Sequence, residues 1–148
     1  MQERFKEFTF LIAKLNKYIH KIKTGEMAEF NLKGPHVTSI YYLYKGGALT
    51  AKEIRNLSGE DKASISRAID YLEERGYVTC ESCAEKRYNA KLILTDMGKE
   101  IGKRITDKID KVLEASSIGI NPEHRAIMYK TLALVSYNLE EFCSKYDD

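Results

Sequence analysis

The chain has 148 residues, 43% of them hydrophobic and 31% charged, a composition typical of one soluble globular domain. No apolar run approaches the roughly 18 residues of a membrane-spanning helix, and the charged start MQERFKEF has no signal-peptide core. We therefore expect a cytoplasmic protein with no membrane partner. Three cysteines are too few, and odd in number, for the disulfide framework of a secreted protein.

The formal net charge of +2 is weak evidence for a nucleic-acid partner, and its distribution weakens it further. Residues 1–33 carry seven basic and four acidic side chains (+3), residues 50–91 eight of each, and residues 96–148 eight and ten (−2). Any DNA affinity of the central segment must therefore come from the direction in which individual charges point.

Apolar residues at spacings of three and four predict an amphipathic helix over residues 3–23, with Gly25 as its stop. Its apolar stripe consists of Phe5, Phe8, Leu11, Ile12, Leu15, Ile19 and Ile22. Residues 27–34 are predicted to form a loop. A second helix, rich in tyrosine, is expected from Pro35 to Tyr44 and is ended by Gly46-Gly47.

Two short helices with a tight turn between them are predicted within Leu49–Val78. Thr50 and Glu53 have the spacing of a capping box, in which each side chain bonds the other residue's backbone amide. The first helix should run to about Leu57, and Ser58-Gly59 should form the turn.

Asp61 is a good N-cap for the second short helix, and Gly76 should end it. One face of this helix is predicted to be buried, through Ile65, Ile69 and Leu72. Lys62, Ser66 and Arg67 point away from that face, and Ser64 lies near the helix start.

A hairpin should follow, with strands at residues 77–80 and 91–94 around a polar loop that carries the charged tip Glu85-Lys86-Arg87. Thr95-Asp96 then begins a long helix whose apolar positions are Ile101, Ile105, Ile109 and Val112.

Asn121-Pro122-Glu123 starts a last helix. We expect this helix to bury Ile127, Met128, Leu132, Val135, Leu139 and Phe142. A small central module cannot cover the stripes of the terminal helices, so we predict a self-complementary homodimer. The alternative is a monomeric bundle of six helices.

These segments resemble the MarR family of bacterial and archaeal regulators over nearly the whole chain. DKASISRAIDYLEERGYV is similar to the family's helix-turn-helix, LILTDMGKEI to its wing strand and next helix, and INPEHRAIMYKTL to its C-terminal helix. The resemblance implies a mainly α (α+β) fold and one MarR-type domain, 1–148. Within it, residues 35–95 would form the winged helix-turn-helix, and 1–33 with 96–148 the dimerisation helices.

The wing departs from the family pattern in one respect. The family usually carries an Asp and an Arg two residues apart, with the Arg seven residues before the Thr. Here Glu85 and Arg87 have that spacing, but Arg87 lies eight residues before Thr95, and Tyr88 occupies the usual Arg position. Either the wing is one residue longer or Arg87 and Lys86 have slightly different roles.

A recognition helix presents its N-terminal half to base edges in the major groove. Arg67 can contact guanine or clamp a phosphate, Lys62 suits a phosphate, and Ser64 and Ser66 permit close approach. Thr50 and Lys52 begin the preceding helix, whose first amides can hold a phosphate oxygen. We expect Lys62 and Thr50 to position the protein on the DNA, and Lys86 with Arg87 to enter the minor groove. The alternatives are a solvated helix face and a polar loop tip.

Two further sites follow from the resemblance and from spacing. The family's effector pocket lies between the dimer helices and the reading module, which makes His36, Ser39, Tyr41 and Tyr42 candidates; ordinary packing is the alternative. Cys80 and Cys83 form a C-x-x-C, which suggests redox or metal chemistry. Residues three apart on a strand face opposite sides, and zinc wants four ligands, so inert thiols are the alternative.

The sequence therefore predicts a regulator that binds a pseudo-palindromic operator in double-stranded DNA as a homodimer. We expect it to act as a repressor that leaves the DNA when a small molecule binds or when thiols are oxidised. The alternative is a winged helix used for protein contacts without DNA. We expect no enzymatic activity and no bound metal or cofactor, because the sequence contains no Gly-rich phosphate loop, no HExxH motif and no nucleophile elbow.

Overall fold

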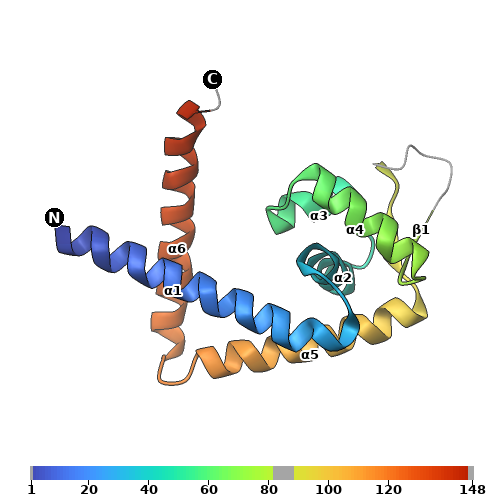
Figure 1. The fold of residues 1–148 in the computed structure, drawn as a ribbon, viewed down its shortest axis with the longest axis horizontal. Helices are drawn as coiled ribbons and strands as arrows, with labels where there is room; N and C mark the ends of the chain where they lie inside the picture. Colours follow the sequence, from blue (N-terminus) through green and yellow to red (C-terminus); the bar gives the residue numbers. More distant parts are fainter. Residues whose placement is uncertain (1, 82–88, 147–148) are drawn as a thin grey trace. The chain divides into compact units, whose positions relative to one another are not determined.

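The computed structural model describes residues 2–81 and 89–146, with the side chains of Gln2 and Phe5 left aside. The described residues are mainly helical with one small antiparallel sheet, which confirms the predicted fold class. The chain divides into two compact units, Met1–Lys108 and Ile109–Asp148, and each is described by itself (Figure 1).

The first unit contains both short helices and the sheet. Its elements are α1 (Gln2–Met27), the 3-10 helix η1 (Ala28–Phe30), α2 (Gly34–Gly46), α3 (Ala51–Ser58), α4 (Lys62–Glu74), β1 (Val78–Cys80), β2 (Leu92–Leu94) and the first part of α5 (Asp96–Ser116). The second unit contains the rest of α5, then α6 (Pro122–Cys143) and η3 (Ser144–Tyr146).

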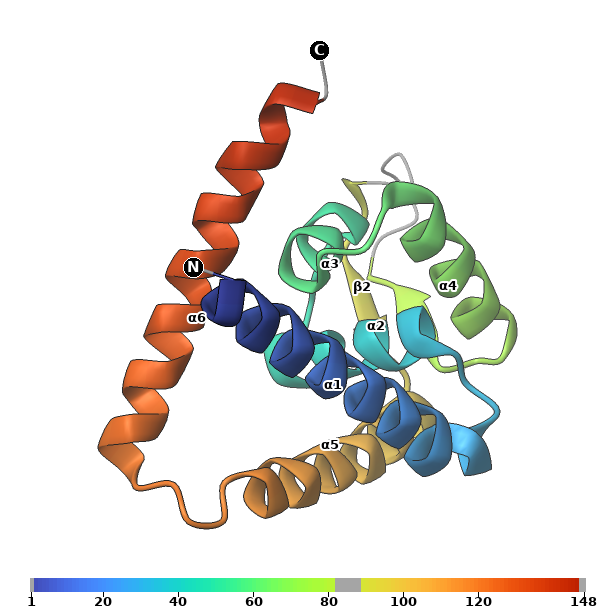
Figure 2. The same cartoon turned by 60° about the vertical axis from the view of Figure 1, so that its left-hand side comes forward.

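Helix α2 is the centre of the first unit, where it packs against α3, α4 and β2. Figures 1 and 2 show α3 and α4 on one side of α2, with α1 and the first part of α5 on the other. The largest side chains with almost no exposed surface come from α2, α3, α4, β2 and α5: Ile40, Leu43, Ile54, Ile65, Leu72, Leu92 and Ile105. Burial of this apolar surface fixes how the two short helices sit on α2.

Local signals in the sequence set most helix ends. The predicted caps at Thr50, Asp61 and Asn121 are all present. Gly47 and Gly59 adopt the positive φ values of 79° and 71° that end α2 and α3. The predicted stop at Gly25 is wrong, because α1 continues to Met27. A single glycine costs a helix only about 1 kcal/mol, too little to end it.

The sheet is a two-stranded antiparallel ladder that pairs Val78 with Leu94 and Cys80 with Leu92. A further bridge joins Leu49 to Leu92, whose N–H groups donate to each other's carbonyls at 3.1 and 2.8 Å. The base of the wing is therefore fixed to the segment that leads into α3.

The apolar stripes of α1 and α6 remain exposed. No residue of α6 is buried, so the expectation that Leu132 and Leu139 are buried is wrong for the single chain: they are 40% and 51% exposed. The same holds for Ile127, Met128, Val135 and Phe142. On α1, Leu11 and Leu15 are likewise about half exposed. Of the described helices, none has the length and apolar character to cross a membrane.

Candidate nucleic-acid interface

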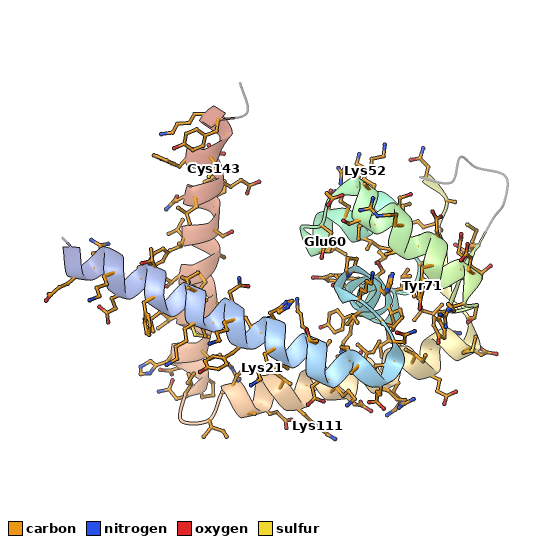
Figure 3. The ribbon with its side chains drawn as sticks, in the orientation of Figure 1. Lys21, Lys52, Glu60, Tyr71, Lys111 and Cys143 are labelled. Carbon is orange, nitrogen blue, oxygen red and sulfur yellow. The ribbon has the colours of Figure 1, made fainter. Side chains whose placement is uncertain are left out.

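The first turn of α3 is closed by its own capping box. The Glu53 amide donates to Thr50 Oγ1 at 3.2 Å, and the Glu53 carboxylate accepts from the amide and the hydroxyl of Thr50 at 2.7 and 3.0 Å. A helix start leaves four amides without partners inside the helix, so those of Ala51 and Lys52 remain for an outside group. Figure 3 shows Lys52 on the side of α3 away from α2. Thr50 thus fixes the turn, whereas Lys52 faces outward.

Lys91 approaches the same turn from the base of the wing. Its ammonium lies 3.2 Å from Glu53 Oε2, and both side chains are about half exposed. The pKa of Glu53 is lowered mainly by the hydrogen bond from the Thr50 amide, then by the Thr50 hydroxyl and by Lys91. The carboxylate therefore keeps its charge, and Lys91 balances it beside the outward amides.

Helix α4 has a buried face and an outward face. Ile65, Ile69 and Leu72 are at most 3% exposed, which confirms the predicted buried face. The outward row is formed by Lys62, Ala63, Ser66 and Arg67, all exposed. This row occupies the first two turns, so basic and small side chains are presented together at the N-terminal half of the helix.

The polar groups at the start of α4 are linked to one another. Asp61 Oδ1 accepts from the Ser64 amide at 2.8 Å, and Asp61 Oδ2 accepts from the Ser64 hydroxyl, also at 2.8 Å. Arg67 Nη2 donates to Ser64 Oγ at 3.5 Å. The pKa of Asp61 is lowered, first by the Ser64 amide and then by its hydroxyl. The side chain of Ser64 is therefore engaged inside the helix, while Ser66 is exposed.

The predicted minor-groove residues Lys86 and Arg87 lie outside the described residues. The described strand β2 is joined to the segment before α3 by the bridge between Leu49 and Leu92.

A cavity of about 670 Å³ lies between α1, the connection to α2, and α4. Its wall has five basic or imidazole side chains and no acid: His20, Lys23, Lys33, His36 and Arg75. An anion would therefore meet only favourable charges at this wall.

The cavity is organised around a stack of side chains on Tyr71. The His36 ring lies parallel to the Tyr71 ring, with centroids 4.2 Å apart and planes 7° apart. The Arg75 guanidinium lies 4.9 Å from the Tyr71 centroid, and the Tyr71 hydroxyl donates to the Asn31 carbonyl at 3.2 Å. Figure 3 labels Tyr71 on α4. One wall of the cavity is thus part of the same helix that carries Arg67.

Of the four residues expected at an effector pocket, only His36 lines this cavity. Ser39 is fully buried, and its hydroxyl donates to the Pro35 carbonyl at 2.8 Å. Tyr41 and Tyr42 pack edge to face against each other at 5.4 Å, several positions further along α2. The helical turn carries them to another side of α2 than His36.

His36 is held as a neutral imidazole. Its Nδ1 accepts from the Lys33 amide at 3.0 Å. Its pKa is lowered, mainly because burial penalises the charged ring and further by the nearby charge of Lys33. The proton of the neutral ring is therefore on Nε2, where it can be donated.

Comparison with known proteins agrees with this arrangement. The MarR family profile matches residues 30–87. The HTH-type transcriptional regulator YfiV of Bacillus subtilis is 24% identical over 116 residues, which cover 78% of this chain and 72% of YfiV. The solved structure of NMB1585, a MarR family regulator from Neisseria meningitidis, is similar with a TM-score of 0.80 at 17% identity and covers 94% of this chain and 97% of that one. Residues 30–87 of this chain thus match the MarR family model, and the chain has the fold of a solved MarR family regulator.

The fold is also similar to Staphylococcus aureus MarR in complex with salicylate and kanamycin, with a TM-score of 0.78 at 17% identity over 92% of each chain. YfiV is named a transcriptional regulator and NMB1585 a MarR family regulator, in agreement with the predicted class.

The cysteine motif Cys80–Cys83 is described only in part. Cys80 is half-buried, and its thiol lies 3.6 Å from Glu73 Oε1. Cys83 lies outside the described residues. Across residues 2–81 and 89–146, no three His, Cys, Asp or Glu side chains are grouped so as to hold a metal ion.

The sequence did not point to four residues that the structure places at the outward face of α4, at the cavity or at the first turn of α3: Ala63, Tyr71, Arg75 and Lys91. Ala63 could have been found from its place on the outward face of α4, four residues before Arg67. Tyr71 and Lys91 gave no signal, because their partners Asn31, His36 and Glu53 lie far away in the sequence. Arg75 lies four residues after Tyr71, and its role depends on that ring.

Proposed function

We propose that the chain is a sequence-specific transcription regulator that binds a pseudo-palindromic operator as a homodimer and acts as a repressor. The observation that carries the proposal is the outward row of Lys62, Ser66 and Arg67 on α4, opposite a buried face that fixes the helix. A helix presented in this way fits the major groove with its N-terminal half against the bases.

Each outward side chain has a distinct role in this proposal. Arg67 contacts guanine with two hydrogen bonds or clamps a phosphate, and Ser66 permits close approach. Lys62 and Lys52 bind phosphates on either side of the groove, with the α3 amides as further donors. Lys86 and Arg87 enter the minor groove from the wing.

The test is selection from random DNA at a stated salt concentration, followed by titration of the selected site. Arg67→Ala should weaken binding by about 1–3 kcal/mol and relax the preference at one position of each half-site. Lys21→Ala is the matched control, because it removes one charge from α1 (Figure 3). Selection of no preferred sequence would favour the alternative, a winged helix that binds proteins.

The dimer in this proposal is supported by the exposed apolar stripes of α1 and α6. Patches of this kind mark association surfaces, and a twofold axis would cover both without additional chain. Leu132→Asp should shift the protein from dimer to monomer in sedimentation, whereas Glu140→Asp should not. A monomeric wild type at micromolar concentration would refute the dimer.

The effector in this proposal is a small aromatic acid that binds in the cavity beside Tyr71. Support comes from the wall that carries Lys23, Lys33 and Arg75 and no acid, from the stacked rings, and from the similarity to a MarR protein solved with salicylate. Salicylate is a suitable probe: calorimetry should show binding, Arg75→Ala should weaken it, and Lys45→Ala should not. Binding unaffected by Arg75→Ala would place the ligand elsewhere.

Release by oxidation is the second form of regulation that the sequence leaves open. It requires Cys80 and Cys83 to react together. Operator affinity should then fall in peroxide and recover in a thiol reductant, and Cys83→Ser should abolish the effect. An affinity that peroxide leaves unchanged would identify both thiols as inert.

A further inference from the structure

The hydroxyl of Ser64 faces along α4 rather than outward. It donates to Asp61 Oδ2 at 2.8 Å and accepts from Arg67 Nη2 at 3.5 Å. A hydroxyl has a single hydrogen to donate, and here that hydrogen is directed to the carboxylate. Ser64 is also only partly exposed, whereas Ser66 and Arg67 are exposed. A direct contact from Ser64 to a base edge would first have to break this arrangement.

The side chains of Asp61, Ser64 and Arg67 are connected by hydrogen bonds in the N-terminal half of α4. Asp61 is itself held, because its second carboxylate oxygen accepts from the Ser64 amide at 2.8 Å and so caps the helix. Its charge attracts the guanidinium through the intervening hydroxyl. The lowered pKa of Asp61, due first to the Ser64 amide and hydroxyl and in smaller part to Arg67, agrees with this series.

We propose that Ser64 is a positioning residue, which Asp61 fixes and which holds the Arg67 guanidinium in place before DNA arrives. This inference rests on the proposed DNA-binding function. A free arginine side chain loses rotamer freedom when it is fixed against DNA, and an arginine that is already held loses less. Both guanine and phosphate accept two hydrogen bonds from a planar guanidinium in one orientation, so the smaller loss of rotamer freedom favours either contact.

The rival explanation is that Ser64 only stabilises the helix start. The chain offers a clean separation of the two roles, because the cap uses the backbone amide of Ser64 and not its hydroxyl. Ser64→Ala therefore keeps the backbone cap from Asp61 and removes the hydroxyl that connects Asp61 Oδ2 to Arg67. Ser64→Thr keeps a hydroxyl at the same position and serves as the conservative variant.

The experiment is a double-mutant cycle on the selected operator with Ser64→Ala, Arg67→Ala and the double variant. Ser64→Ala should weaken binding about 2- to 12-fold in the presence of Arg67, the factor that corresponds to fixing one flexible side chain. In the Arg67→Ala background the same change should have less than about a twofold effect, and Ser64→Thr should restore most of the affinity. Thermal melting of Ser64→Ala should match the wild type.

A second readout uses the protein without DNA. In nitrogen-15 spectra of the arginine side chains, Arg67 should be more ordered in the wild type than in Ser64→Ala. Equal effects of Ser64→Ala in both backgrounds, or equal order in both proteins, would overturn the inference while the proposed function stands. If the wild type binds no DNA sequence, the proposed function fails first, and the positioning role fails with it.

Discussion

Gly98 offers a sharp test of the packing between α5 and the base of the wing. A Cβ at this position would lie 2.0 Å from the Tyr77 carbonyl oxygen and 2.9 Å from its carbon. That oxygen already accepts from the Thr95 amide at 3.0 Å, so it is backbone held by a hydrogen bond. Gly98→Ala would therefore force the start of α5 away from the Tyr77 backbone by more than about 1 Å to reach ordinary contact distance.

The magnitude follows from two opposing effects. Overpacking of this kind costs about 1–3 kcal/mol and occasionally more. Alanine in place of glycine inside a helix returns about 1 kcal/mol. Because the 2.0 Å contact is with backbone, we take the upper end of the overpacking cost, and the net effect of Gly98→Ala is to lower the free energy of unfolding by about 2 kcal/mol, which corresponds to a fall in Tm of roughly 4–8 °C for a chain of this size.

Gly25 provides the matched control for this prediction. It lies inside α1, and a Cβ there would meet nothing within 4 Å. Gly25→Ala should raise the free energy of unfolding by about 0.5–1 kcal/mol. Both variants are measured by urea and thermal unfolding at one protein concentration, because association would shift the midpoint. A Gly98→Ala protein as stable as Gly25→Ala would refute the packing of α5 against Tyr77.

Three further predictions concern the N-cap Asn121, the hydrogen bond of Tyr71 and the imidazole of His36. Asn121→Ala should lower stability by about 1 kcal/mol in urea unfolding, because it removes the cap of α6, whereas Asn121→Asp should not. Tyr71→Phe should cost about 0.5–1.5 kcal/mol through the lost bond to Asn31, and no loss would mean that this bond is absent in solution. The pKa of His36 is lowered from 6.5 by burial first and by Lys33 second, so between the folded pKa and 6.5 the unfolded chain holds more protons. Stability should therefore rise with pH through that window and be level above it, and His36→Gln should flatten the dependence of Tm between about pH 5 and 7; an unchanged slope would exclude His36.

Much of the local structure was readable from the sequence, because its causes are local. The capping box of Thr50 and Glu53, the cap at Asp61 and the buried face of α4 depend on residues within one or two turns. The spacing of apolar residues fixed which side of α4 turns inward, and so which side could meet a partner. The predicted helix end at Gly25 was wrong because the low helix propensity of glycine is a weak preference that the neighbouring turns override.

Contacts across long stretches of sequence could not be read in this way. Lys91 lies beside Glu53 because the wing pairs with Leu49, and Tyr71 stacks on His36 because α4 packs on α2. Periodicity describes one element at a time and carries no information on which faces of two elements meet.

Sequence alone thus determined the helices, their caps, the family of the reading module and the outward row of α4. Only the tertiary structure decided that the cavity uses His36 and not Tyr41 or Tyr42, and that Gly98 must lack a side chain. The physical reason is that helix ends are set by hydrogen bonds between near neighbours, whereas cavities and close contacts are set by how apolar faces pack together.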